Sequence, residues 1–80
     1  MFLEIITPDK KLFSGEVNLV KVPGTKGSFA ILKNHAPIIS TLEKGQIKIV
    51  KADEKEEFID IEGGMIEVKK NKIIVLADNF

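Results

Sequence analysis

The chain has 80 residues, of which 44 % are hydrophobic and 30 % are charged, and it contains no cysteine. This length fits one small domain, since compact domains usually run to about 100–150 residues. Neither disulfides nor thiolate metal sites can support its core. Twelve basic and twelve acidic residues give a formal net charge of zero, which argues against a nucleic-acid binder with a basic face. The sequence has no apolar run of about 18 residues that could form a membrane span.

A two-residue alternation of polar and apolar side chains dominates the sequence, and it predicts strands because successive strand residues point to opposite faces. Apolar segments at residues 2–6 and 17–22 begin the series, alternating segments follow at 46–49, 59–62 and 66–69, and an apolar run ends it at 73–77. Turn residues separate these segments: Pro8-Asp9, Pro23-Gly24, Lys44-Gly45, Gly63-Gly64 and Lys70-Asn71. We therefore predict one all-β domain over residues 1–80, a small sandwich or flattened barrel of two antiparallel sheets.

Three local patterns refine this prediction. The charged run at residues 51–57 is typical of a hairpin tip in water, with a functional acidic patch as the alternative. In residues 17–22 the apolar phase slips by one position between Leu19 and Val20, which predicts a β-bulge. The Gly63-Gly64 pair predicts a tight turn or a close backbone approach. No helix start follows it, so we expect no phosphate site there.

More residues are apolar than one interior can use. The run at residues 73–77 is apolar on both faces, and Val50 and Phe58 lie out of phase with the alternation around them. Phe2, Leu3, Ile5 and Ile6 likewise point both ways around Glu4. Contiguous exposed apolar surface usually marks an interface, so we expect a permanent protein partner to cover the outer face of one sheet. The alternative is a scatter of single surface aliphatic residues, which is common in monomers.

The sequence offers little catalytic chemistry. His35 is the only histidine, and no serine or threonine is paired with it by spacing, so we predict no catalytic, cofactor or metal site. Asn34-His35-Ala36-Pro37 nevertheless has the composition of a shaped turn, because Asn34 tolerates left-handed geometry and Pro37 favours an extended Ala36. His35 is then either a turn residue or a residue at a subunit contact.

A series of short motifs resembles the ε subunit of F-type ATP synthases. In chain order they are Phe13-Ser14-Gly15, residues 22–27, His35-Ala36-Pro37-Ile38, residues 44–50, Glu57-Phe58-Ile59, Gly63-Gly64-Met65-Ile66-Glu67-Val68 and Val75-Leu76-Ala77-Asp78. The resemblance covers nearly the whole chain. It implies a β-sandwich of two five-stranded sheets, and hence about ten short strands.

The resemblance also implies a role. The family's ε subunit is a non-catalytic part of the central rotor stalk that binds the γ subunit and sits on the polar loops of the c ring. There it couples proton flow to ATP synthesis or hydrolysis, at the cytoplasmic face of the bacterial membrane and without inserting into it. Carried over to this sequence, Gly27, Ser28 and Phe29 are expected to contact the c ring, and Thr7, His35 and Ser40 to contact γ. The chain departs from the family's usual glycines at Ala30 and Asn34, and Ser28 stands where some members have an acidic residue.

Many members of this family continue into a two-helix C-terminal domain that inhibits hydrolysis or binds ATP. We expect that domain to be absent here, and therefore no nucleotide binding. A different class of function also fits the residues: a free-standing β-barrel module that binds proteins or peptides by strand addition. Balanced charge and few aromatic residues make a nucleic-acid partner the least favoured of these possibilities.

Overall fold

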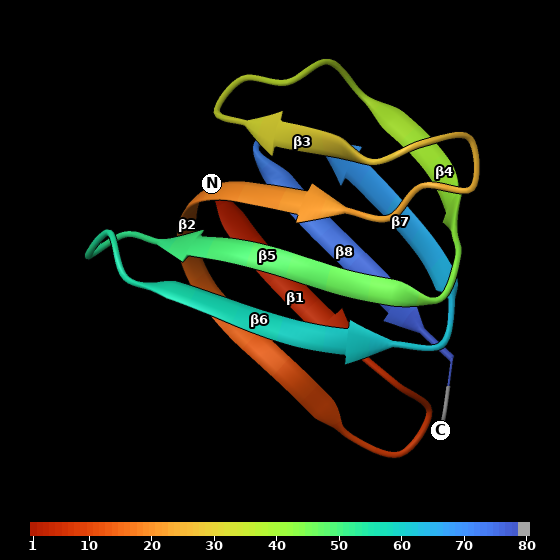
Figure 1. Cartoon of the computed structure of the whole chain (residues 1–80). Helices are drawn as coiled ribbons and strands as arrows, with labels where there is room; N and C mark the ends of the chain where they lie inside the picture. Colours follow the sequence, from red (N-terminus) through yellow and green to blue (C-terminus); the bar gives the residue numbers. More distant parts are fainter. Residues whose placement is uncertain (79–80) are drawn as a thin grey trace.

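The computed structural model describes residues 1–78, which form eight strands and no helix (Figure 1). In chain order the strands are β1 (Phe2–Ile6), β2 (Lys11–Val22), β3 (Phe29–Leu32), β4 (Ile38–Leu42), β5 (Gly45–Lys51), β6 (Glu56–Ile61), β7 (Gly64–Lys69) and β8 (Lys72–Ala77). The all-β prediction is confirmed. The number of strands in the described chain is eight rather than about ten, partly because residues 11–22 form one continuous strand of 12 residues.

The strands form one curled sheet in the order β4-β7-β8-β1-β2-β5-β6, with β3 paired to β2. The first half of β2 pairs with β1, and its second half pairs with β5 and β3. We call the layer of β4, β7, β8, β1 and the first half of β2 sheet A, and the layer of the second half of β2 with β3, β5 and β6 sheet B. One strand is therefore common to both layers, as Figure 1 shows.

One pairing differs from the antiparallel arrangement that the sequence predicts. β1 and β8 run parallel, with Ile5 opposite Val75, whereas the other paired strands are antiparallel. Parallel neighbours need a long connection, and nearly the whole chain lies between these two strands. The first and last strands are thereby paired in the middle of sheet A.

The core lies between the two layers and is built from the alternation in the sequence. Ile47 and Ile49 point into it from sheet B, and Ile66 and Val68 point into it from sheet A. Within residues 1–78 the buried side chains are all apolar, and no buried side-chain nitrogen or oxygen lacks a partner. The period of two therefore identified the inner face of these strands correctly.

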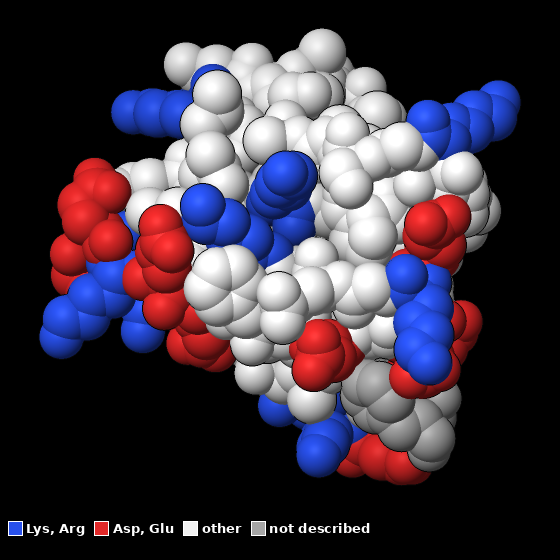
Figure 2. All heavy atoms as spheres, viewed as in Figure 1, with Lys and Arg blue, Asp and Glu red and all other residues white. Residues whose placement is uncertain are grey.

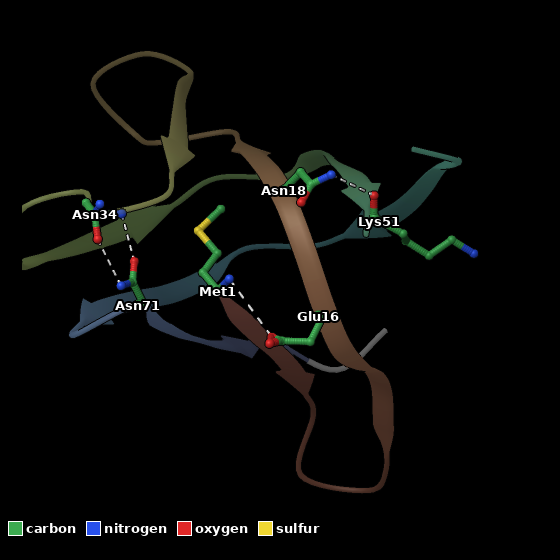
Figure 3. A network of polar contacts seen from close by, with 6 residues as sticks. All are labelled: Met1, Glu16, Asn18, Asn34, Lys51 and Asn71. Atoms are coloured by element: carbon green, nitrogen blue, oxygen red, sulfur yellow. Dashed lines mark hydrogen bonds and ion pairs between the residues drawn. The ribbon is translucent and has the colours of Figure 1, made fainter. Parts of the chain in front are cut away.

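The predicted bulge is present in β2, slightly earlier than the sequence placed it. Val17 pairs with Lys51 and Leu19 with Val50, so Asn18 is the extra residue. Its side-chain amide donates to the Lys51 carbonyl oxygen at 3.3 Å (Figure 3) and to Glu54 Oε1 at 3.1 Å. The exposed Asn18 side chain thus donates a hydrogen bond to a carbonyl group next to the point where the strand pairing is interrupted. In the sequence, the shift in the apolar pattern that marks the bulge appears only after Asn18.

Two turns match their predictions. Residues 52–55 are exposed at the tip between β5 and β6, as expected for a hairpin end in water. Gly63 and Gly64 have φ angles of 141° and 149°. Residues other than glycine rarely adopt such angles. A Cβ on Gly64 would also overlap the carbonyl oxygen of Leu76. The pair is therefore both a sharp change of direction and a close backbone approach.

Asn71 connects three separate parts of the chain (Figure 3). Its side-chain oxygen accepts a hydrogen bond from Asn34 N at 2.7 Å, and its Nδ2 donates to Asn34 Oδ1 at 3.0 Å. Its carbonyl oxygen accepts a bond from Phe2 N at 2.9 Å. The two asparagines have φ angles of 60° and 67°, so the left-handed geometry expected for Asn34 is confirmed. The pair fixes the β3–β4 connection to the β7–β8 turn.

Replacing Asn71 by glycine should lower the free energy of unfolding by about 1–2 kcal/mol, because two side-chain hydrogen bonds are lost while the backbone geometry is still accepted. Urea denaturation measures this loss. Lys70→Gly is the matched control: Lys70 also has a positive φ, of 50°, and its side chain is exposed. Equal stability of the two glycine variants would show that the asparagine pair contributes nothing.

Candidate functional site

Sheet A presents an apolar outer face. Its outward side chains, taken from the burial pattern of each strand, include Phe2, Ile6, Ile39, Met65, Ile74 and Leu76. Leu76 lies at the centre, opposite Met65 on one side and Ile6 on the other, and it is 49 % exposed. We call these six residues the sheet A face. The expectation of surplus apolar surface on the outside of one sheet is met here.

The outside of sheet B is more polar. Lys48 lies 3.6 Å from Glu56 across the β5–β6 hairpin, and Gln46 Nε2 donates to Asp60 Oδ1 at 3.3 Å. Leu32 and Phe58 are exposed on this side: Leu32 lies opposite Leu19, and Phe58 lies opposite Lys48. Figure 2 shows charged side chains over β5 and β6 and few over β3 and β4. Of the large apolar side chains that are exposed, Ile39, Met65 and Leu76 lie on sheet A, and Leu32 and Phe58 lie on sheet B. Sheet A therefore offers the more apolar of the two outer walls.

A hollow of about 660 Å³ lies at one end of the sandwich, between the β2–β3 loop and β4. It is lined by residues 24–29 and 38–41, among which Lys26 is the one charged residue. The loop is attached to β4 by hydrogen bonds: Thr25 N donates to the Thr41 carbonyl oxygen at 3.1 Å, and the two threonine hydroxyls lie 2.8 Å apart. The hollow thus has a fixed floor and an almost uncharged rim.

Four of the six residues singled out by the sequence meet at this hollow. Gly27 and Ser28 are exposed in the loop, Phe29 is half-buried at the start of β3, and Ser40 is half-buried on β4. The sequence assigned the first three to the c ring and Ser40 to γ. In the fold they line one surface, so a single partner could contact all of them.

The remaining two residues lie elsewhere and serve turns. Thr7 closes the β1–β2 turn: its backbone N–H donates to the Lys10 carbonyl oxygen at 2.8 Å, and its hydroxyl accepts from Lys10 N at 3.1 Å. His35 lies in the β3–β4 connection, where its Nδ1 is 2.7 Å from the Ala36 carbonyl oxygen. Ala30, where the resemblance implies a glycine, lies inside β3 rather than in the loop.

Sequence reasoning missed part of these surfaces. Met65 and Ile39 belong to the sheet A face, and Met65 could have been found because it is out of phase with Ile66 and Val68. The Thr25–Thr41 contact carries no sequence signal, since these residues are 16 positions apart. Within residues 1–78 no group of three or more His, Cys, Asp or Glu is placed to hold a metal ion. The same residues include no helix long and apolar enough to cross a membrane.

The fold and its surfaces define a small β-sandwich domain with one apolar outer wall. The family model for the β-sandwich domain of the ATP synthase delta/epsilon chain matches residues 1–80. The chain therefore belongs to the ATP synthase epsilon chain family, and it corresponds to the N-terminal β-sandwich domain of that subunit. Members of this kind are non-catalytic subunits, which agrees with the expectation that the chain is not itself an enzyme.

Individual relatives support the same assignment. The chain is 44 % identical to the ATP synthase epsilon chain of Chlorobium limicola over 77 residues, covering 96 % of this chain and 88 % of that one. It is 43 % identical to that of Chlorobaculum tepidum over 76 residues, covering 95 % and 86 %. It is 46 % identical to that of Dichelobacter nodosus over 74 residues, covering 92 % of this chain but 52 % of the relative. The chain thus spans about half the length of the Dichelobacter protein.

Two solved structures share the fold at low sequence identity. A chain of the Euglena gracilis mitochondrial ATP synthase, seen with OSCP, F1 and the c ring, superposes with a TM-score of 0.87 at 18 % identity, covering 94 % of this chain and 48 % of that one. A chain of the Tetrahymena thermophila mitochondrial ATP synthase, from its central stalk and c ring, gives 0.80 at 19 % identity, covering 99 % and 63 %. Both therefore show the same sandwich.

Proposed function

We propose that this chain couples rotation in an F-type ATP synthase by packing the sheet A face against the γ subunit and turning Gly27, Ser28 and Phe29 toward the c ring. As an epsilon chain it is a component of the central stalk. Its place is at the cytoplasmic face of a bacterial membrane, held there by its partners. Coupling then needs no chemistry of its own: the domain has to stay folded and keep its contacts while the stalk turns.

The observation that carries this proposal is the apolar outer face of sheet A. Leu76 and Ile39 are 49 % and 67 % exposed on a domain of only 80 residues. Exposed apolar surface of this kind is costly in water, and covering it against a partner stabilises a complex in proportion to the area removed from solvent. The same face also carries charge: Glu67 lies between Ile39 and Ile74, and the Glu4–Lys11 ion pair of 3.1 Å lies at the β1–β2 side. Around Leu76 itself the paired residues, Met65 and Ile6, are apolar.

The expectation for the c ring rests on the shape of the loop. Gly27 has a φ of 126° and no heavy atom within 4 Å of the place where a Cβ would be, and Ser28 beside it is exposed. An exposed, nearly uncharged loop suits contact with the polar loops of another subunit. We assign Gly27, Ser28 and Phe29 to that contact, and Thr7, His35 and Ser40 to the γ side.

Replacing Leu76 by lysine should reduce the γ recovered with this chain about tenfold or more, because a charge would be buried at the centre of the interface. The measurement is co-purification of γ with the tagged chain from cells that express both. Leu32→Lys is the matched control, since Leu32 is 55 % exposed but lies outside sheet A.

Undiminished recovery of γ with Leu76→Lys would remove sheet A from the interface. If the wild-type chain recovered various soluble proteins and no γ, the free-standing interaction module would be the better description.

A further inference from the structure

The strand at one edge of sheet A lacks the usual protection. Edge strands expose unpaired backbone groups, and proteins normally guard them with charges, proline or a bulge. β6, an edge of sheet B, carries Glu56, Glu57 and Asp60. β4 pairs only with β7 among the named strands and has no charged residue between Ile38 and Leu42. Only Pro37, just before it, interrupts strand pairing.

Half of this edge is already occupied by the chain itself. Glu43 N donates to the Pro23 carbonyl oxygen at 2.8 Å, the Thr41 carbonyl oxygen accepts from Thr25 N at 3.1 Å, and Gly24 forms a bridge with Leu42. These bonds form the start of an antiparallel ladder on the side of β4 that faces away from β7. The edge is therefore competent to pair with an extended segment.

The ladder stops before Ile39. Backbone groups of alternate strand residues point to the same side, so the N–H and C=O of Ile39 point the same way as those of Thr41. The chain turns away at this level, where Gly27 N donates to the Gly24 carbonyl oxygen at 2.9 Å and leads into β3. Within residues 1–78 no segment pairs with Ile39 on that side, and the hollow of about 660 Å³ lies beside it.

The hollow specifies the chemistry of its occupant. On the β4 side Ile38 and Ile39 supply an apolar wall, and Lys26 is the one charged residue in the lining. Lys26 is exposed and makes no ion pair with any described residue. A complementary segment is therefore extended, has apolar side chains and carries a carboxylate that reaches Lys26.

We propose that an extended segment of the γ subunit adds to the free edge of β4 at Ile39, continuing the ladder begun by residues 23–25 and placing a carboxylate beside Lys26. The choice of γ rests on the proposed function. It also rests on continuity, because Ile39 belongs to the sheet A face and is at the same time one of the residues that line the hollow. A partner that covers this face reaches the free edge without a gap.

The test compares two substitutions at one position. Ile39→Pro removes the outward N–H and leaves the bonds between β4 and β7, whereas Ile39→Ala shortens the same side chain and keeps the N–H. Ile39→Pro should weaken binding of purified γ about tenfold, and Ile39→Ala clearly less, about twofold to threefold. The affinity is measured by calorimetry after the melting temperature has shown that each variant is folded. Equal losses in the two variants overturn strand addition.

A second measurement does not depend on a proline variant that folds. In the wild-type chain, hydrogen exchange of the Ile39 amide should slow at least tenfold when γ is bound, because that N–H would then be in a ladder. An Ile39 amide that exchanges equally fast in the complex overturns the proposal.

The carboxylate is tested by charge. Lys26→Glu should weaken γ binding about tenfold at low salt and by much less at high salt, since screening weakens exposed charge pairs. Lys33→Glu, at an exposed lysine beyond β3, is the control. Unchanged affinity with Lys26→Glu overturns the assigned pairing.

The outcomes separate this proposal from the function on which it rests. If Leu76→Lys abolishes γ binding while Ile39→Pro behaves like Ile39→Ala, γ sits on the sheet A face without adding a strand. If wild-type chain binds no γ, both proposals fail together.

Discussion

Gly64→Ala is expected to lower the free energy of unfolding by about 3–5 kcal/mol, the largest effect of any single methyl group in this chain. Two costs add at this position. Its φ of 149° is unfavourable for an L side chain, and the new Cβ would overlap the Leu76 carbonyl oxygen and lie 3.0 Å from Ala77 Cα. These are backbone atoms of the paired strand β8, so they yield only if the ladder between β7 and β8 shifts. A domain of this size has a total stability of about 4–12 kcal/mol.

Gly27→Ala separates the two costs. Gly27 also has a positive φ, of 126°, but a Cβ there would meet nothing within 4 Å. Its substitution should therefore show the conformational cost alone, about 1–2 kcal/mol. Both variants are measured by urea denaturation followed by circular dichroism. A Gly64 variant no less stable than the Gly27 variant would show that β7 and β8 have room to separate.

Ile5→Ala should cost about 2–5 kcal/mol, because it removes a fully buried side chain and leaves a cavity. Ile5 is 0 % exposed and lies on β1 between Phe13 of β2 and Val75 of β8. Its loss weakens the packing at the pairing of the first strand with the last. Thermal and urea unfolding both report the change.

Ile39→Ala is the control for the core substitution, since it deletes the same atoms from a side chain that is 67 % exposed. Its stability should change by less than about 0.5 kcal/mol. This result would also establish that any loss of γ binding by Ile39→Ala comes from a changed contact and not from an unstable domain. Equal losses at Ile5 and Ile39 would mean that the sandwich interior tolerates a cavity at its centre.

The period of two predicted most of the fold because burial imposes it directly. Ile47, Ile49, Ile66 and Val68 fall on the inner face wherever their strands pair. The same pattern does not distinguish parallel from antiparallel neighbours, so the pairing of β1 with β8 was out of reach. The pattern also does not show that residues 11–22 form one strand. This strand pairs with β1 in its first half and with β5 in its second, and no polar break in the sequence marks the change of partner.

The candidate surfaces were only partly predictable for a similar reason. Leu76 was visible as an apolar residue outside the buried phase, whereas the meeting of Ser40 with the loop of residues 24–28 depends on tertiary structure. The free edge at Ile39 is a property of backbone hydrogen bonds, which no side chain encodes. What the resemblance supplied was the list of loop residues; the fold supplied which of them lie together.

The sharing of β2 between the layers has a mechanical consequence. In a sandwich of two separate sheets, only side-chain packing resists shear of one sheet over the other. Here a single backbone of 12 residues passes through both, so sideways displacement of one wall pulls on covalent bonds in the other. A torque applied at the wall that we propose to face γ would then reach the opposite wall with little slack, which suits a part that must turn as a solid body.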